Sequence, residues 1–199
     1  MHRIGRTQES KSEYEAALIA LQDAPDLLGA SRIYAGLALV HGQLGELDEA
    51  VELAEMALIL ARSDDEAEAR AHQRIAQIQW RRQAYEVAVT HGVASLDGYV
   101  RLNDRRGRGA AHNTLGLAYA SLGRSDDAIF EFEVAVDDFE RTGSEHGLAC
   151  ALDNLAQQYA QRGANDQAMA YLERAVEILT RIGMGPDGLV AAMWQGGFG

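Results

Sequence analysis

The sequence has few of the residues that cross-link, stiffen or anchor a chain. Its 199 residues include one cysteine, Cys150, two prolines and one lysine, Lys11. A single cysteine excludes an internal disulfide framework. No apolar run reaches the 18 residues that a membrane-spanning helix needs, so we expect no membrane partner. The first six residues contain no apolar stretch, so we read no secretory signal and predict a cytoplasmic protein.

Basic residues are also scarce relative to acidic ones. The chain has 18 lysines and arginines against 30 aspartates and glutamates, a formal net charge of −12. This balance repels a phosphate backbone at long range, so we expect no nucleic-acid partner. No alternating strand pattern is sustained, whereas apolar residues recur at spacings of three and four, which predicts helices throughout.

One unit recurs along the chain. Four alanines head the second half of each copy, at intervals of 38, 40 and 40 residues: Ala50, Ala88, Ala128 and Ala168. A glycine lies five residues before three of them: Gly45, Gly123 and Gly163. A fixed period of this length with two helical stretches is typical of an α-solenoid. The sequence therefore predicts an all-α array of antiparallel helix pairs, with about four full repeats.

The expected helices fall into four pairs. They cover residues 27–43 with 47–62, 65–82 with 85–101, 106–121 with 125–141, and 145–161 with 165–182. Residues 8–22 resemble a second helix without its first, which indicates either a cap or a fragment of a longer array. We expect residues 1–182 to form the solenoid domain and residues 183–199 to form a short C-terminal capping helix or a flexible tail.

Local signals predict where the helices begin and turn. Ser63 to Glu66 form a capping-box pattern, and three further residues stand where N-caps are expected: Ser125, Ser144 and Asn165. The three turn glycines suit a left-handed backbone. The second copy departs from the pattern, because Gln83 replaces the turn glycine, Gly92 falls inside a helix and Ser95 replaces an alanine. We expect this copy to be the least stable.

The repeats resemble a known family. The best copies, residues 113–128 (NTLGLAYASLGRSDDA) and 153–168 (DNLAQQYAQRGANDQA), are similar to the tetratricopeptide repeat. Their period is longer than the usual 34 residues and resembles the long-repeat subgroup of bacterial signalling and regulatory proteins. The resemblance implies a right-handed superhelix whose first helices line a concave groove for a peptide or protein segment.

Helical spacing, combined with this resemblance, places one set of residues in the groove. The set comprises Arg32, Arg70, Gln73, Arg74, Gln77, Trp80, Arg81, Asn113, Thr114, Leu117, Asn154, Gln157 and Gln161. Amide side chains can donate and accept hydrogen bonds along an extended peptide backbone, and arginine forks bind carboxylates. We therefore expect a protein or peptide partner and hypothesise that it is acidic, with the site centred on Arg70, Arg74, Trp80 and Arg81.

No catalytic or cofactor motif is found. The sequence contains no nucleophile elbow, phosphate loop, dinucleotide fingerprint or paired metal-binding cysteines, so we expect no enzyme, no cofactor and no metal. His72 and His112 hold equivalent places in successive copies, which suggests contact between repeats. Two other functions stay open: a small-molecule effector sensor of a transcription regulator, and a homodimer or larger self-assembly formed through the apolar ends.

Overall fold

The computed structural model describes residues 2–20, 26–61 and 64–183, and every regular element in these ranges is an α-helix. The helices are α1 (His2–Ala20), α2 (Leu27–Leu44), α3 (Leu47–Ala61), α4 (Asp65–Arg81), α5 (Tyr85–Arg101), α6 (Arg105–Ser121), α7 (Ser125–Thr142), α8 (Glu145–Gln161) and α9 (Asn165–Arg181). The eight helices predicted from the apolar spacing are confirmed, each to within about a residue at either end. The expected capping helix over residues 183–199 lies, except for Gly183, outside the described residues.

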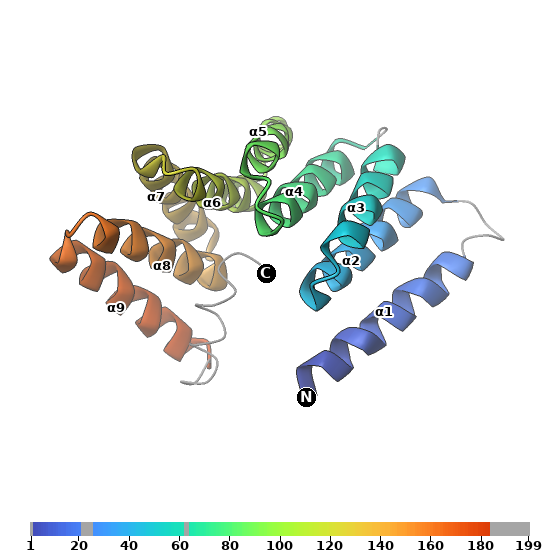
Figure 1. Cartoon of the computed structure of the whole chain (residues 1–199), viewed down its shortest axis with the longest axis horizontal. Helices are drawn as coiled ribbons and strands as arrows, with labels where there is room; N and C mark the ends of the chain where they lie inside the picture. Colours follow the sequence, from blue (N-terminus) through green and yellow to red (C-terminus); the bar gives the residue numbers. More distant parts are fainter. Residues whose placement is uncertain (1, 21–25, 62–63, 184–199) are drawn as a thin grey trace. The chain divides into compact units, whose positions relative to one another are not determined.

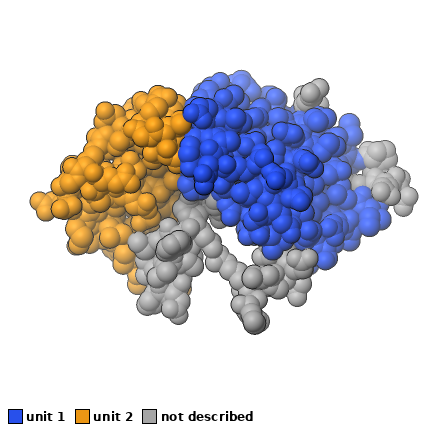
Figure 2. Space-filling model, viewed as in Figure 1, with its two compact units in different colours: residues 1–102 blue, residues 103–199 orange. Residues whose placement is uncertain are grey.

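The helices form hairpins in two compact units. Residues 1–102 contain α1, the pair α2–α3 and the pair α4–α5, and residues 103–199 contain the pairs α6–α7 and α8–α9 (Figures 1 and 2). Within each unit, the first helix of one pair also contacts the first helix of the next, α2 with α4 and α6 with α8. The predicted all-α array of helix pairs is therefore confirmed.

Small residues bring the two helices of each pair together. The four alanines that define the repeat, Ala50, Ala88, Ala128 and Ala168, are all buried. Across the pair, Gly116 lies so close to the ring of Phe132 that an added Cβ would be 2.5 Å from it. In the second copy, Ser95 is fully buried where the other copies have alanine, and its hydroxyl donates to Gln73 Oε1 at 3.2 Å. The core is thus built from close backbone approach and not from large side chains alone.

The turns follow the glycine pattern. Gly45, Gly123 and Gly163 have left-handed φ angles of 85°, 74° and 74°, as predicted. Gln83 adopts the same left-handed conformation, with φ of 63°. This conformation is sterically unfavourable for a residue that has a Cβ. This strain belongs to the second copy, the one that the sequence marks as irregular.

Several of the predicted N-caps are wrong. Asp64, and not Ser63, is the N-cap of α4, and its Oδ1 accepts from the Ala67 N–H at 2.7 Å. Ser125 and Asn165 are the first residues of their helices, after Arg124 and Ala164. Ser144 is the N-cap of α8 but makes no side-chain cap bond. The Ser125 hydroxyl instead donates to Gln158 Oε1 in α8, so a contact between hairpins replaces the local cap.

A buried carboxylate and two arginines join α7 to α6 inside the second unit. Asp138 is fully buried, and its carboxylate accepts from Arg108 Nε at 2.8 Å and from Arg105 Nη1 at 3.5 Å. The hydrogen bond to Asp138 raises the pKa of Arg108. Removing a carboxylate from water costs free energy, and hydrogen bonds and ion pairs of this kind are needed to offset that cost.

Replacing Gln83 with glycine should stabilise the first unit. Gln83→Gly removes the Cβ that conflicts with a left-handed φ, so we expect the free energy of unfolding to rise by about 1 kcal/mol. Urea denaturation followed by circular dichroism measures the change. The matched control Gly123→Gln introduces the same conflict in the third copy and should lower the stability by a similar amount. A loss of stability in Gln83→Gly would contradict the interpretation.

Removing the partner of Asp138 should be far more harmful than breaking an exposed pair. Arg108→Met leaves a buried carboxylate without its main donor, which should cost about 3–5 kcal/mol of unfolding free energy. The control is Arg141→Met, because Arg141 pairs with Asp137 at 2.8 Å on the exposed face of α7. Its loss should cost less than about 1 kcal/mol. If the two variants lose the same unfolding free energy, the burial of Asp138 does not determine how much its ion pair contributes to stability.

Candidate functional site

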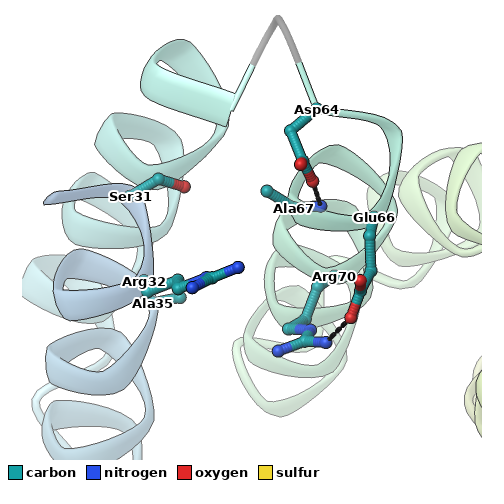
Figure 3. A pocket seen from close by; sticks show the side chains of 7 residues that line it. All are labelled: Ser31, Arg32, Ala35, Asp64, Glu66, Ala67 and Arg70. Atoms are coloured by element: carbon teal, nitrogen blue, oxygen red, sulfur yellow. Dashed lines mark hydrogen bonds and ion pairs between the residues drawn. The ribbon is translucent and has the colours of Figure 1, made fainter. Parts of the chain in front are cut away.

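In the first unit, two of the predicted groove arginines lie beside a small cleft between α2 and α4. Arg32 extends from α2 and Arg70 from α4, and both line this cleft together with Ser31, Ala35 and the first turn of α4 (Figure 3). Both arginines are exposed. Arg70 is ion-paired with Glu66, whereas Arg32 forms no ion pair with any residue that the structure describes. The cleft has room for about one water molecule. It is therefore too small to enclose a ligand, although a partner could contact the side chains at its edge.

Arg74 adds a third guanidinium one helical turn further along α4. It is partly buried, and its Nη1 donates to Gln77 Oε1 at 2.9 Å. Desolvation lowers the pKa of Arg74, and this effect outweighs the opposing influence of Tyr99 and Tyr14; the positive charge of Arg70 makes the smallest contribution, which also lowers it. A carboxylate placed beside Arg74 would favour its charged form.

The remaining predicted groove residues of α4 are already engaged in the fold. Gln73 and Gln77 are buried, and Trp80 and Arg81 are partly buried. The guanidinium of Arg81 donates to the carbonyl of Gly42, which ties α4 to α2. Arg81 therefore joins neighbouring repeats, and a contact of Trp80 with a partner stays a prediction.

In the second unit, the predicted asparagines bind each other. Asn154 Nδ2 donates to Asn113 Oδ1 at 2.9 Å, and both side chains are buried between α8 and α6. Thr114 is also buried, with its hydroxyl donating to the Ala110 carbonyl. The asparagine pair thus links one repeat to the next, whereas the Thr114 hydrogen bond stays within α6. A role of these three residues in peptide binding stays a prediction.

The other three predicted residues of this unit are more accessible. Leu117 packs partly against a cluster around Phe132. Gln157 and Gln161 are exposed on α8. Gln157 Nε2 donates to Asp153 Oδ2 at 2.9 Å, and burial raises the pKa of Asp153.

A concavity between α8 and α9 was not predicted from the sequence. It has a volume of about 650 Å³ and a mostly apolar wall. It is lined by Asp153, Ala156, Gln157, Ala160, Asn165, Ala168, Met169 and Leu172. The repeat contains a signal for it, because all but one of the residues forty positions earlier are apolar or small, the exception being Asn113, and α8 packs against several of them.

The described residues contain no group of three or more His, Cys, Asp or Glu side chains placed to hold a metal ion. Within the same residues, no helix combines the length and apolarity needed to cross a membrane. Cys150 is a buried thiol whose Sγ lies 3.8 Å from His146 Nδ1.

Comparison with known sequences identifies the family. Two sequence profiles, each described as tetratricopeptide repeat, match residues 109–181 and residues 32–63. The chain belongs to the tetratricopeptide repeat family. No curated protein sequence matches it significantly.

Solved structures share the tetratricopeptide fold. BtubC from P. vanneervenii is 25% identical, with a TM-score of 0.75 over 93% of this chain and 78% of that one. A Rap protein complexed with Competence and Sporulation Factor is 19% identical, with a TM-score of 0.81 over 90% of this chain and 51% of its own. Aspartyl phosphate phosphatase F from Bacillus subtilis is 16% identical, with a TM-score of 0.81 over 94% and 52%. This chain spans about half the length of the latter two.

Two tetratricopeptide hairpins have a histidine at the same position but with different partners. His72 Nδ1 lies 2.9 Å from His91 Nδ1 across α4 and α5. His112 Nδ1 lies 2.6 Å from Glu131 Oε2 across α6 and α7. In both hairpins the partner is nineteen residues later. Each histidine thus contacts a residue of its own hairpin, and the contact suggested between His72 and His112 stays a prediction.

The histidine pair should make the first unit sensitive to acid. Burial lowers the pKa of His72 below 6.5, against a smaller opposing effect of Glu68. Burial and the charge of His72 lower the pKa of His91. The unfolded chain then binds more protons than the folded one, so stability present above about pH 6.5 is lost as the pH falls.

The variant His91→Glu tests this cause directly, because it copies the His112–Glu131 pair into α4–α5. We expect it to lose less unfolding free energy than the native chain between about pH 7.5 and 5.5. Urea titrations at several pH values measure the difference. His146→Gln controls for loss of a histidine elsewhere and should leave the native pH dependence in place. If the unfolding free energy of His91→Glu depends on pH as steeply as that of the native chain, the His72–His91 pair is not the cause of the acid sensitivity.

Proposed function

We propose that this chain is a non-catalytic protein-binding module whose α2–α4 face takes an extended partner segment with carboxylate side chains. The observation that supports it most is the cluster of Arg32, Arg70 and Arg74 on two adjacent first helices. Among the described residues, only Glu66 forms an ion pair with any of the three. The cleft that Arg32 and Arg70 line also contains the carboxylates of Asp64, which caps α4, and of Glu66, so an acidic partner would compete with Glu66 for Arg70.

The geometry of the arginines favours a carboxylate over a single point charge. A planar guanidinium presents paired donors that match the two oxygens of a carboxylate. Arg32 and Arg70 project from different helices into the same space, so two forks can bind successive acidic side chains of one segment (Figure 3). An extended segment suits this face because its alternate side chains can point toward the helices.

A solved structure of the same fold supports binding of a partner. The Rap protein, of which 51% aligns with 90% of this chain, was crystallised with Competence and Sporulation Factor. By this analogy the array serves as the recognition or regulatory arm of a larger bacterial signalling protein. In this proposal the chain selects one segment of a partner protein. Arg32, Arg70 and Arg74 would make it prefer a segment with acidic side chains.

A peptide library tests the proposal on the full chain. Extended peptides with aspartate and glutamate at varied positions should bind, and the same peptides with asparagine and glutamine should not. Arg32→Ala with Arg70→Ala should weaken binding of the selected acidic peptide about 100-fold or more, since two charged hydrogen bonds worth about 1.5–3 kcal/mol each are lost. Fluorescence anisotropy measures the affinity, and added salt should reduce it.

The matched control removes the same charge elsewhere. Arg141→Ala with Arg174→Ala alters two exposed, ion-paired arginines of the second unit and should leave the affinity nearly unchanged. A library without acidic enrichment, or equal losses in the two double variants, would overturn the proposal.

A further inference from the structure

The second hairpin brings two imidazole nitrogens together across its two helices. His72 extends from α4 and His91 from α5, and their Nδ1 atoms lie 2.9 Å apart. The two rings are tilted by 41°, with their centroids 5.1 Å apart. The residues are nineteen positions apart in the sequence, so the hairpin and not a local motif places them side by side. Both side chains are half-buried, which leaves solvent access to the pair.

The same place is filled differently in the following hairpins. In the third hairpin it holds a base and an acid, His112 with Glu131 at 2.6 Å. In the last hairpin it holds Leu152 and Tyr171, which pack in one apolar cluster. The members of each of these pairs suit each other, whereas the second hairpin has two bases. Because a neutral imidazole has one donor and one acceptor nitrogen, one Nδ1 must carry a proton to bond the other. A metal ion could take the place of that proton.

The distance between the two nitrogens suits a particular coordination geometry. An imidazole nitrogen lies about 2.0–2.1 Å from a bound divalent transition metal. Two such ligands about 90° apart, as in square-planar or octahedral sites, are therefore about 2.9 Å from each other. Two ligands at the tetrahedral angle of about 109° are about 3.3 Å apart. The His72–His91 distance of 2.9 Å matches the first arrangement, which Ni²⁺ and Cu²⁺ adopt.

The surrounding charge favours a cation. Glu68 lies one helical turn before His72 on α4, and its negative charge acts on the His72 ring. No third His, Cys, Asp or Glu among the described residues is placed to complete a metal site. Two protein ligands therefore leave the remaining coordination positions to water, which the partial exposure of both histidines allows.

We propose that His72 and His91 bind one divalent transition-metal ion of square-planar or octahedral preference, such as Ni²⁺ or Cu²⁺, through their Nδ1 atoms. Both rings are neutral in this complex and carry their protons on Nε2. Imidazole is a preferred ligand of these metals, whereas Mg²⁺ and Ca²⁺ prefer oxygen ligands. The site is separate from the arginine face and does not depend on the proposed function.

The bound ion would act on the most irregular hairpin of the array. Gln83 forms its turn with a left-handed φ of 63°, and Gly92 lies inside α5. An ion that binds α4 and α5 only when they are folded together stabilises this hairpin by mass action. Helix α4 also carries Arg70 and Arg74, so the same ion would steady one side of the arginine face.

Metal titration of the full chain tests the site. After removal of metals with EDTA and dialysis, the chain is titrated with NiCl₂ or CuCl₂ alone. Isothermal titration calorimetry should show one ion per chain. The midpoint of thermal unfolding should rise by about 5–10 °C at a free ion concentration about a hundred times Kd. MgCl₂ should have no effect. With Cu²⁺, electron paramagnetic resonance should show coupling to two nitrogen ligands.

The repeat itself supplies a matched variant without the site. His72→Leu with His91→Tyr copies the Leu152–Tyr171 pair of the last hairpin, so both imidazoles are lost while apolar packing is kept. This double variant should lose ion binding and the rise in Tm. If it fails to fold, His91→Glu gives a second test, because its Cu²⁺ spectrum should show one nitrogen ligand in place of two.

Two controls remove histidines that have other neighbours. His146 lies beside Cys150, and His112 lies beside Glu131. His146→Gln and His112→Gln should therefore both keep the stoichiometry of one ion per chain and the rise in Tm.

Three outcomes would overturn the proposal. The first is a chain that binds neither Ni²⁺ nor Cu²⁺ with saturation. The second is a loss of binding in His146→Gln or His112→Gln that equals the loss in the double variant. The third is one ion for two chains with a doubled mass by light scattering, which would place the ion between two copies.

Discussion

Close approach of the two helices in each pair is the constraint on which the rest of the structure depends. It requires a residue without a large side chain where each second helix crosses its first, and Ala50, Ala88, Ala128 and Ala168 meet this requirement. Because the helices touch at these points, the larger residues on either side are forced toward the neighbouring hairpins. The repeat period, the core and the surface offered to a partner all follow from this packing.

Buried polar contacts then fix the register of neighbouring helices along their axes. Asn154 with Asn113 and Ser125 with Gln158 link successive hairpins, and Asp138 with Arg108 links the helices of one pair. Each contact satisfies a polar group that apolar packing alone would leave without a partner. A shift of one residue along either helix would break the bond, so these contacts specify register more than they add stability.

The helices could be predicted from the sequence because apolar period and turn glycines act locally. The conformation of Gln83 was also predictable, since its place in the repeat requires a left-handed turn whichever residue fills it. The N-caps were harder, because Ser125 uses its hydroxyl for α8 and not for its own helix. Burial of Asn113 and Asn154 could not be deduced from one helix either, since it depends on how far the next first helix covers that face. Helical spacing gives the direction of a side chain but not what lies opposite it.

The distribution of charge separates long-range from short-range recognition. Acidic residues are concentrated in the first turns of several helices, as with Asp65 and Glu66 in α4 and Asp126 and Asp127 in α7, where the helix dipole favours them. At distances beyond a Debye length, an acidic partner therefore meets a negative protein and is repelled. In the proposed site, Arg32 and Arg70 would present their guanidinium groups only on contact, and two charge-assisted bonds at short range would outweigh a screened repulsion. Such a face would discriminate by local geometry and not by attraction from afar, so that net charge alone is a poor guide to what this chain binds.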